Sequence, residues 1–296
     1  IYNMDYREFI RFRERSGSKA SISVVEVPSS MCREFGIATI DKKGTITKFE
    51  EKPERSASRL ASMGIYIFEK DFLIKTLERM KKKIYNLDFG MHVIPDLVNR
   101  KKISAFKYEG FWLDIGTLKS YYSASLALLS ERPRMNLFKK GMNILTVPDD
   151  YPPSILSRSA AGDRCLVCNG CSIEGAVSAS ILSPGVVVEP GARIERSIIF
   201  HDCVIKRGAQ VKNVIMDRNT VIGRNASVGD GDASVPNRLQ PEYLDFGLTL
   251  IGRGTIIPGG ISIGTNCLVC GSRDDGKIGS GDIGDGDCRI AGDVLI

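Results

Sequence analysis

The sequence predicts a molecule in two parts, an α/β domain followed by a β-helix of short parallel strands. Strand and helix patterns alternate through about the first 130 residues, which favours a layered α/β sheet. Later residues repeat at a fixed period, which is typical of a solenoid. Composition divides in the same way. Residues 1–140 hold 27 Lys and Arg against 17 Asp and Glu, with 7 of the 30 glycines, whereas residues 141–296 hold 14 against 18 and the other 23 glycines.

Five strands and three helices are predicted in the first part. Apolar runs bounded by turn residues predict strands over residues 21–27, 35–40, 44–49, 62–68 and 103–108, the second and third forming a hairpin. Cap residues predict helices that run from Asp5 to Gly17, from Asp71 to about Lys83 and from Thr117 to about Leu129. Asp5 and Glu8 also have the spacing of a capping box.

The second part repeats every 17 residues. Residues 187–203 and 204–220 align with identical Val, Gly, Ala and Ile at four positions, and the register extends in both directions. Further on, apolar residues recur at strict six-residue intervals, at Ile251, Ile257, Ile263 and Val269. Each repeat is therefore interpreted as one coil of a β-helix, whose stacked coils bury a continuous core.

The repeat alignment makes a testable statement about charges. A shift of 17 residues places Glu189 over Lys206 and Glu195 over Lys212 on successive coils, about 4.8 Å apart. Apolar neighbours flank these positions, so the charged side chains are expected to face outward.

Several function classes are disfavoured by the residues themselves. No Gly-rich phosphate loop follows a predicted strand, and no basic stripe interleaved with aromatic residues supports nucleic-acid binding. The apolar stretches 65–68 and 124–129 are too short to span a bilayer. Eight cysteines without a secretory signal indicate a reducing compartment, and we expect a cytoplasmic protein without nucleic-acid or membrane partners.

Two metal-like patterns occur in the second part. Cys165, Cys168 and Cys171, with the later pair Cys267 and Cys270, have zinc-like spacing, but they fall on the coil period, where small residues fill the core or the turns. Residues 282–287 (DIGDGD) are similar to one copy of a calcium-binding repeat. Neither pattern is taken as a metal site.

An ordered set of motifs resembles one enzyme family. The chain carries Phe35-Gly36, then FEEKP at 49–53, ASMGIYIF at 61–68, DFG at 88–90 and FWLDIGT at 111–117, followed by hexapeptide repeats. This set resembles the glucose-1-phosphate adenylyltransferases, or ADP-glucose pyrophosphorylases, over essentially the whole chain. The resemblance implies the C-terminal part of a Rossmann-like nucleotidyltransferase α/β domain followed by a left-handed β-helix. The expected ranges are 1–133 for the first domain, 134–163 for a linker and 164–296 for the β-helix.

The resemblance also implies a reaction and its residues. ATP and α-D-glucose 1-phosphate would give ADP-glucose and pyrophosphate, with Mg²⁺ as cofactor, for glycogen or α-glucan synthesis. Motif matches assign glucose 1-phosphate binding to Gly36, Glu51, Lys52 and Ser62, and catalysis to Lys52 and Asp114, the latter also a Mg²⁺ ligand. These residue types suit the task, because a lysine neutralises a phosphate and a carboxylate is a hard oxygen ligand. The family further implies a homotetramer formed through the β-helix and a small-molecule allosteric effector.

Rival interpretations share much of this pattern. A non-catalytic regulatory subunit, or a nucleotidyltransferase that uses another nucleoside triphosphate, would have the same fold. A hexapeptide acyltransferase would need a catalytic histidine, for which His201 is the candidate. The family's glycine-rich GGxGxRLxPL nucleotide loop has no counterpart in residues 1–296, so we expect this chain alone to be inactive and not to bind ATP tightly.

Overall fold

The computed structural model describes residues 1–130, 137, 145–147, 150–157, 160, 162–272 and 275–290. The chain forms two compact units, Ile1–Leu113 and Asp114–Ile296. This boundary precedes the helix that the sequence assigns to a first domain of residues 1–133. The difference arises because that helix, α4 (Leu118–Ala127), packs on the β-helix through Tyr122. Half of the expected linker, 134–163, lies outside the described residues.

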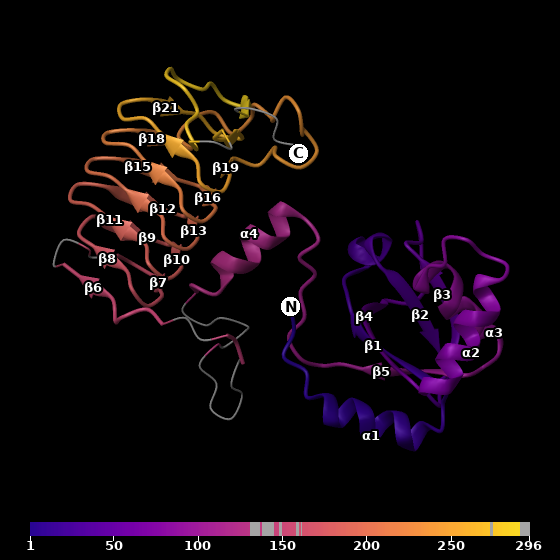
Figure 1. The fold of residues 1–296 in the computed structure, drawn as a ribbon. Coiled ribbons are helices and arrows are strands. Elements are labelled where there is room, and N and C mark those ends of the chain that lie inside the picture. The colour runs from indigo at the N-terminus through magenta and orange to yellow at the C-terminus, as the bar shows by residue number, and fades with distance from the viewer. Residues whose placement is uncertain are drawn as a thin grey trace. The chain divides into compact units, whose positions relative to one another are not determined.

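The first unit is built on one mixed sheet (Figure 1), and it confirms the five predicted strands. The strand order is β3-β2-β4-β1-β5, in which β1 and β5 are parallel and the other neighbours are antiparallel. The strands are β1 (Ala20–Glu26), β2 (Gly36–Ile40), β3 (Ile46–Glu51), β4 (Leu60–Phe68) and β5 (Ile103–Lys107). The turn between β2 and β3 reaches the far edge of the sheet, where the Ala105 amide donates to the Gly44 carbonyl at 2.9 Å.

The caps of two predicted helices differ in detail. α1 (Tyr6–Ser16) begins after Asp5 and ends at Gly17 as predicted, but the Asp5 carboxylate accepts from the Arg7 amide and guanidinium, so no capping box forms with Glu8. α2 (Lys70–Lys81) begins after Glu69, and Asp71 lies inside its first turn. An acidic residue there still stabilises the positive end of the helix dipole.

Three short elements were not predicted. They are a 3₁₀ turn at Ser29–Glu34, a π-helical turn at Phe89–Val93 and the helix α3 (Ile94–Asn99) that continues from it.

Alternating residues of the sheet pack against helices on both faces. Ala20, Ile22 and Val24 of β1 join Met80 of α2 and Leu97 of α3 in one core cluster. The opposite face of the sheet, with members such as Val25 and Phe106, packs against Phe9 of α1, which is fully buried. Burial of alternate residues on opposite faces is the period-2 pattern of a two-sided strand, and the first unit is therefore a three-layer α/β/α arrangement.

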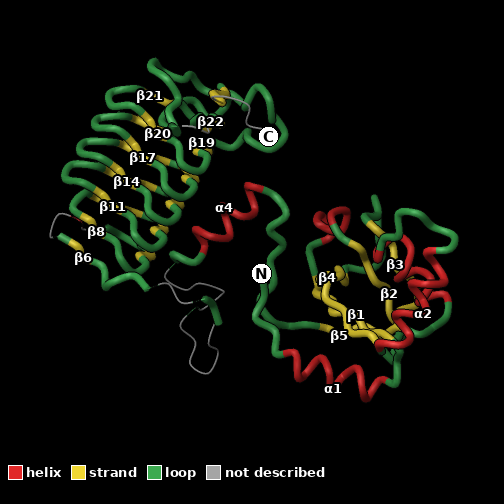
Figure 2. Tube along the Cα trace, viewed as in Figure 1, coloured by secondary structure: helices red, strands yellow, loops and turns green. Residues whose placement is uncertain are grey.

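The second unit confirms the β-helix and its 17-residue register. Figure 2 shows short strands separated by loops and stacked in successive coils. Val187 pairs with Val204, Ile194 with Val211 and Ile198 with Ile215, all in parallel. The strands form three sheets, ordered β23-β22-β19-β16-β13-β10-β7, β20-β17-β14-β11-β8-β6 and β21-β18-β15-β12-β9.

Each of these strands is two or three residues long. They are β6 (Ile155–Leu156), β7 (Leu166–Val167), β8 (Ser172–Ile173), β9 (Ala176–Ser178), β10 (Ile181–Leu182), β11 (Val187–Val188), β12 (Arg193–Glu195), β13 (Ile198–Ile199), β14 (Val204–Ile205), β15 (Gln210–Lys212), β16 (Val214–Met216), β17 (Val221–Ile222), β18 (Ser227–Val228), β19 (Thr249–Ile251), β20 (Ile256–Ile257), β21 (Ser262–Ile263), β22 (Leu268–Cys270) and β23 (Cys288–Ile290). The six-residue series from Ile251 to Val269 is buried in the core.

The predicted charge register is correct, although the partners differ. Glu195 pairs in register with Lys212 on the next coil, as the alignment requires. The Lys212 ammonium instead forms its ion pair with Asp230, at 3.4 Å. The Glu189 carboxylate accepts from the Arg207 backbone amide at 2.7 Å. The exposed charged residues therefore follow the coil spacing, but local geometry decides which neighbour each one contacts. Each such exposed ion pair contributes little to stability.

The sequence did not predict the excursion between β18 and β19, residues 229–248. Two fully buried asparagines anchor it to the coils. Asn266 donates from Nδ2 to the carbonyls of Ala233 and Val235 at 3.1 and 2.8 Å, and Asn237 donates to the Asn266 carbonyl at 2.8 Å. Buried amides that are fully hydrogen-bonded fix a loop in one conformation. No helix of the described residues is long and apolar enough to cross a membrane.

Candidate functional site

Three of the predicted substrate-binding residues meet on neighbouring strands of the first unit. Gly36 begins β2 and pairs with Glu51, the last residue of β3. On the other side, β2 pairs with β4 through Ile37 and Ala61, so Ser62 follows one step along the same register. Motifs separated in sequence are thereby brought to one end of β2.

Gly36 is closely packed against two side chains of β3. A β-carbon built on Gly36 would lie 2.4 Å from Cζ of Phe49 and 2.8 Å from Oε2 of Glu51. A side chain at this position would have to displace the Phe49 ring and the Glu51 carboxylate, so Gly36 lets the carboxylate lie directly against the backbone of β2. The space that a side chain at Gly36 would fill is thus occupied by Glu51, another of the predicted site residues.

Lys52 has an unusual backbone conformation. It has a φ of 46°, and its amide donates to the Phe35 carbonyl at 3.1 Å. The one other non-glycine residue of the first unit with positive φ is Lys101, just beyond the C-cap of α3. A left-handed non-glycine residue costs roughly 1 kcal/mol or more, and such strain is concentrated at functional sites. The Lys52 side chain is exposed, available to a charged ligand.

The turn at 88–90 adds two residues that sequence reasoning did not assign. A β-carbon on Gly90 would lie 2.6 Å from Oε2 of Glu51, so this glycine, like Gly36, contacts the carboxylate. Asp88 precedes the π-helical turn, and its side chain accepts from the Met91 amide at 2.7 Å. The DFG triplet at 88–90 was the sequence signal that could have pointed to these two residues, but its spacing from FEEKP does not predict that it packs beside Glu51.

Tyr66 and Phe89 form an aromatic wall beside these groups. Their rings stack with centroids 5.8 Å apart and an interplanar angle of 21°. A β-bulge in β4 separates Ser62 from Tyr66, with Gly64 at a φ of 71° and its amide donating to the Ser62 hydroxyl at 3.2 Å. Bulges re-aim side chains near functional sites, and this one lies inside the SMGIY motif.

Burial raises the pKa of the Glu51 carboxyl above its ordinary value. The positive charge of Lys52 opposes this shift, and the negative charge of Asp88 adds to it. Burial also raises the pKa of the Tyr66 phenol; a hydrogen bond with Ser62 opposes that shift, and the charges of Glu51 and Asp88 add to it. The site therefore combines two interacting carboxylates, hydroxyl groups and one lysine.

Asp88→Asn should lower the pKa of Glu51 without restoring the ordinary value. The substitution removes a negative charge, whereas burial, the larger cause, remains. Asparagine is also a good N-cap, so the turn should persist. Carboxyl ¹³C shifts followed through a pH titration measure the change. Asp71→Asn, on an exposed position of α2, is the control. An unchanged Glu51 titration in Asp88→Asn would contradict this electrostatic description.

Asp114, the predicted metal ligand, is the first residue of the second unit and is exposed. It does not cap α4, because Thr117 does so in a capping box with Ser120. An exposed carboxylate free of that role fits Mg²⁺, which is usually held by one or two carboxylates together with substrate phosphates.

Within the part of the chain that the structure describes, the spacing of the cysteines does not gather them into one group. The described residues contain no group of three or more His, Cys, Asp or Glu side chains placed to hold a metal ion. The thiols of Cys203 and Cys267 are buried in the coils, and each donates at 3.1 Å to a carbonyl of the next coil, those of Asp217 and Gly284. Burial raises the pKa of both thiols to about 11, which disfavours the thiolate that zinc requires.

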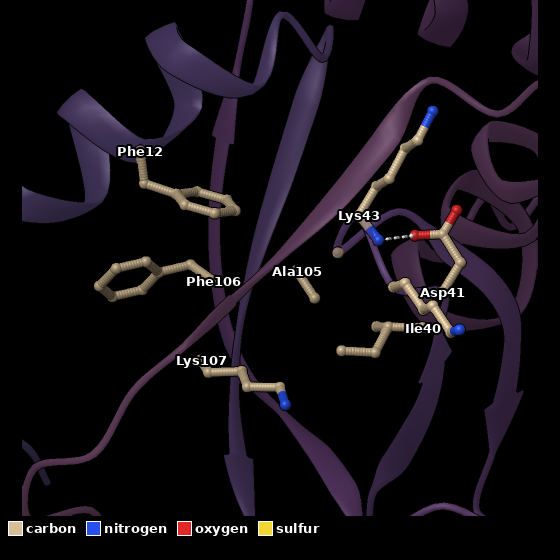
Figure 3. A pocket seen from close by; sticks show the side chains of 9 residues that line it. Phe12, Ile40, Asp41, Lys43, Ala105, Phe106 and Lys107 are labelled. Atoms are coloured by element: carbon tan, nitrogen blue, oxygen red, sulfur yellow. Dashed lines mark hydrogen bonds between the residues drawn. The ribbon is translucent and has the colours of Figure 1, made fainter.

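A groove elsewhere in the first unit contains none of the predicted residues (Figure 3). It has a volume of about 660 Å³ and lies between α1, β5 and the turn that joins β2 to β3. Phe12, Phe106 and Ala105 line it together with the lysines 42, 43 and 107. The Asp41 carboxylate in this groove is already used, since it accepts from the amides of Lys43 and Thr45.

Comparison with known proteins agrees with both parts of the fold. Residues 1–131 match the family described as Nucleotidyl transferase, and residues 155–239 match the family described as GlmU-like, C-terminal hexapeptide. Proteins named glucose-1-phosphate adenylyltransferase are similar along most of the chain. Those of Acetivibrio thermocellus and Thermomicrobium roseum are 34% and 40% identical, each over 91% of this chain and 63% of the relative. The protein of Lachnospira eligens is 40% identical over 92% and 64%, respectively. The chain spans less than two thirds of the length of these relatives.

Proposed function

We propose that this chain belongs to the glucose-1-phosphate adenylyltransferase family, whose named members it resembles along most of its length, and that its first unit binds glucose 1-phosphate for the synthesis of ADP-glucose. The observation that carries the proposal is the convergence of Gly36, Glu51 and Ser62 on three neighbouring strands, with Lys52 directly beyond them. A ligand with one anionic group and several hydroxyls matches such a set of side chains.

The proposed contacts follow from the chemistry of each group. Lys52 supplies a positive charge to the sugar phosphate. The carboxylates of Glu51 and Asp88 accept hydrogen bonds from sugar hydroxyls, and the Ser62 hydroxyl can donate or accept. The Tyr66 and Phe89 rings provide an apolar wall for the sugar ring. Held in this way, a sugar phosphate is restricted in position and orientation, which is the main protein contribution to phosphoryl-group chemistry.

The proposed reaction needs further groups. A phosphate oxygen of glucose 1-phosphate attacks the α-phosphorus of ATP, the bond to the leaving pyrophosphate breaks, and ADP-glucose forms. Asp114 would hold Mg²⁺, which when bound neutralises charge on the phosphates.

Assembly and regulation are further parts of the proposal. The first coil leaves Ile155 and Leu156 of the edge strand β6 exposed at 73% and 55%, which supports association through the β-helix, as in a homotetramer. A cavity of about 240 Å³ in the second unit, lined in part by Arg196 and Lys212, offers a place for a small anionic effector. Eight free cysteine thiols support a cytoplasmic location.

Pyrophosphate release tests the reaction. In the protein whose sequence contains residues 1–296, release should require glucose 1-phosphate and be fastest with ATP. Equal or faster release with UTP, GTP or dTTP would contradict the choice of ATP. Binding of glucose 1-phosphate without any turnover would indicate a non-catalytic subunit.

A further inference from the structure

We propose that His92 is a positioning residue that holds the Asp88–Gly90 turn against Glu51. This inference rests on the proposed function for its effect on glucose 1-phosphate, but the contact itself is independent of that ligand. His92 is the fourth residue of the π-helical turn and is half-buried. Its Nδ1 accepts a hydrogen bond from the Asp88 backbone amide at 3.1 Å.

Two side chains close the turn reciprocally. The Asp88 carboxylate accepts from the Met91 amide, while the His92 ring accepts from the Asp88 amide. The arrangement is similar to a capping box, but the side chain that accepts from the N-cap amide is a histidine one position later, at N4 instead of N3. Since Nδ1 is the acceptor, the neutral ring carries its proton on Nε2.

The two ends of the turn are held unequally. At its C-terminal end, Val93 and Ile94 are fully buried in the core. At its N-terminal end, Leu87 is only partly buried against that cluster, while Asp88 itself is exposed and Tyr85 is completely exposed. The His92–Asp88 hydrogen bond therefore fixes the less anchored end.

Displacement of this end would reach the candidate site directly. Gly90 lies against the Glu51 carboxylate, and Phe89 stacks on Tyr66. If the Asp88 amide loses its acceptor, the turn can open while Val93 stays buried. Glu51 then loses the backbone that confines its carboxylate, and the site loses its preorganised geometry.

Two substitutions of His92 distinguish its role as a hydrogen-bond acceptor from a role in packing alone. Asparagine carries Oδ1 at the position of the imidazole Nδ1, so His92→Asn retains the acceptor. His92→Leu has a similar bulk and no acceptor. Loss of one neutral hydrogen bond should change a local equilibrium by about 2- to 10-fold.

Amide hydrogen exchange tests the contact in the 296-residue chain. In His92→Leu, the amide of Asp88 should exchange about 2- to 10-fold faster, while core amides such as that of Ile22 keep their rates. In His92→Asn, the Asp88 amide should exchange as in the wild type. An unchanged Asp88 rate in His92→Leu, or equal acceleration in both variants, would overturn the proposal.

Calorimetry with glucose 1-phosphate tests the consequence. His92→Leu should weaken binding by about 2- to 10-fold, and His92→Asn should leave it within about 2-fold. Equal affinity of the wild type and His92→Leu would overturn the role in positioning the site. If the wild type itself binds no glucose 1-phosphate, the proposed function fails, whereas the exchange measurement still decides whether His92 holds the turn.

Discussion

Lys52→Ala should weaken the binding of glucose 1-phosphate by about 10- to 150-fold. A hydrogen bond to a charged group contributes about 1.5–3 kcal/mol, and each 1.4 kcal/mol corresponds to tenfold in affinity. Because the sugar phosphate is charged both in the bound substrate and in the transition state, the loss should appear chiefly in KM and much less in kcat. Titration calorimetry measures the affinity, and initial rates of the protein whose sequence contains residues 1–296 measure KM and kcat.

The backbone at this position makes alanine the appropriate substitution. Lys52 has a positive φ, and alanine meets nearly the same conformational cost as lysine, whereas glycine would also relieve strain. Lys43→Ala, on the turn that borders the groove of Figure 3, is the matched control and should not alter binding. An unchanged affinity in Lys52→Ala would remove Lys52 from the site.

Asp114→Asn should reduce turnover by about 100-fold or more while leaving the fold intact. Loss of a metal-ligating carboxylate forfeits about 3 kcal/mol of charge stabilisation on the transferring phosphates. The thermal unfolding midpoint should not change, because Thr117 and not Asp114 caps α4. Pyrophosphate release by the protein whose sequence contains residues 1–296, at saturating substrates and as a function of Mg²⁺ concentration, measures the effect.

One control variant accompanies the Asp114 experiment. Glu109→Gln, an exposed carboxylate change before the FWLDIGT motif, should have wild-type turnover. Turnover near the wild-type value in Asp114→Asn would instead assign Asp114 to the surface and withdraw it as the metal ligand.

The β-helix was predictable because one short period fixes the position of every residue in a coil. Once Val187 was aligned with Val204, the pairing of Glu195 with Lys212 followed, and the structure has both. The excursion after Val228 was not predictable, because it depends on single buried amides, Asn237 and Asn266, whose partners lie far away in sequence.

The candidate site was predictable in part for a similar reason. Gly36 and Glu51 lie on one hairpin, so local register brings them together. The contact of Gly90 with Glu51 depends on a π-helical turn, and neither apolar periodicity nor residue spacing encodes where such a turn packs. The prediction that Asp71 caps α2 was wrong because it depended on single side chains. Glu69 forms ion pairs with Lys19 and Arg13 and is the residue before the first turn, so the N-cap lies two residues before Asp71.

Glucose 1-phosphate is expected to bind where β2 begins, and amide chemical-shift mapping measures this residue by residue. On titration of glucose 1-phosphate into the isotope-labelled chain, the amides of Gly36, Glu51, Lys52, Ser62 and Gly90 should shift together and saturate with one dissociation constant. Glucose alone should give smaller shifts, because it lacks the group that Lys52 binds. Shifts centred instead on Gly44 and Lys107 in the groove of Figure 3, or no shifts at millimolar ligand, would contradict the account.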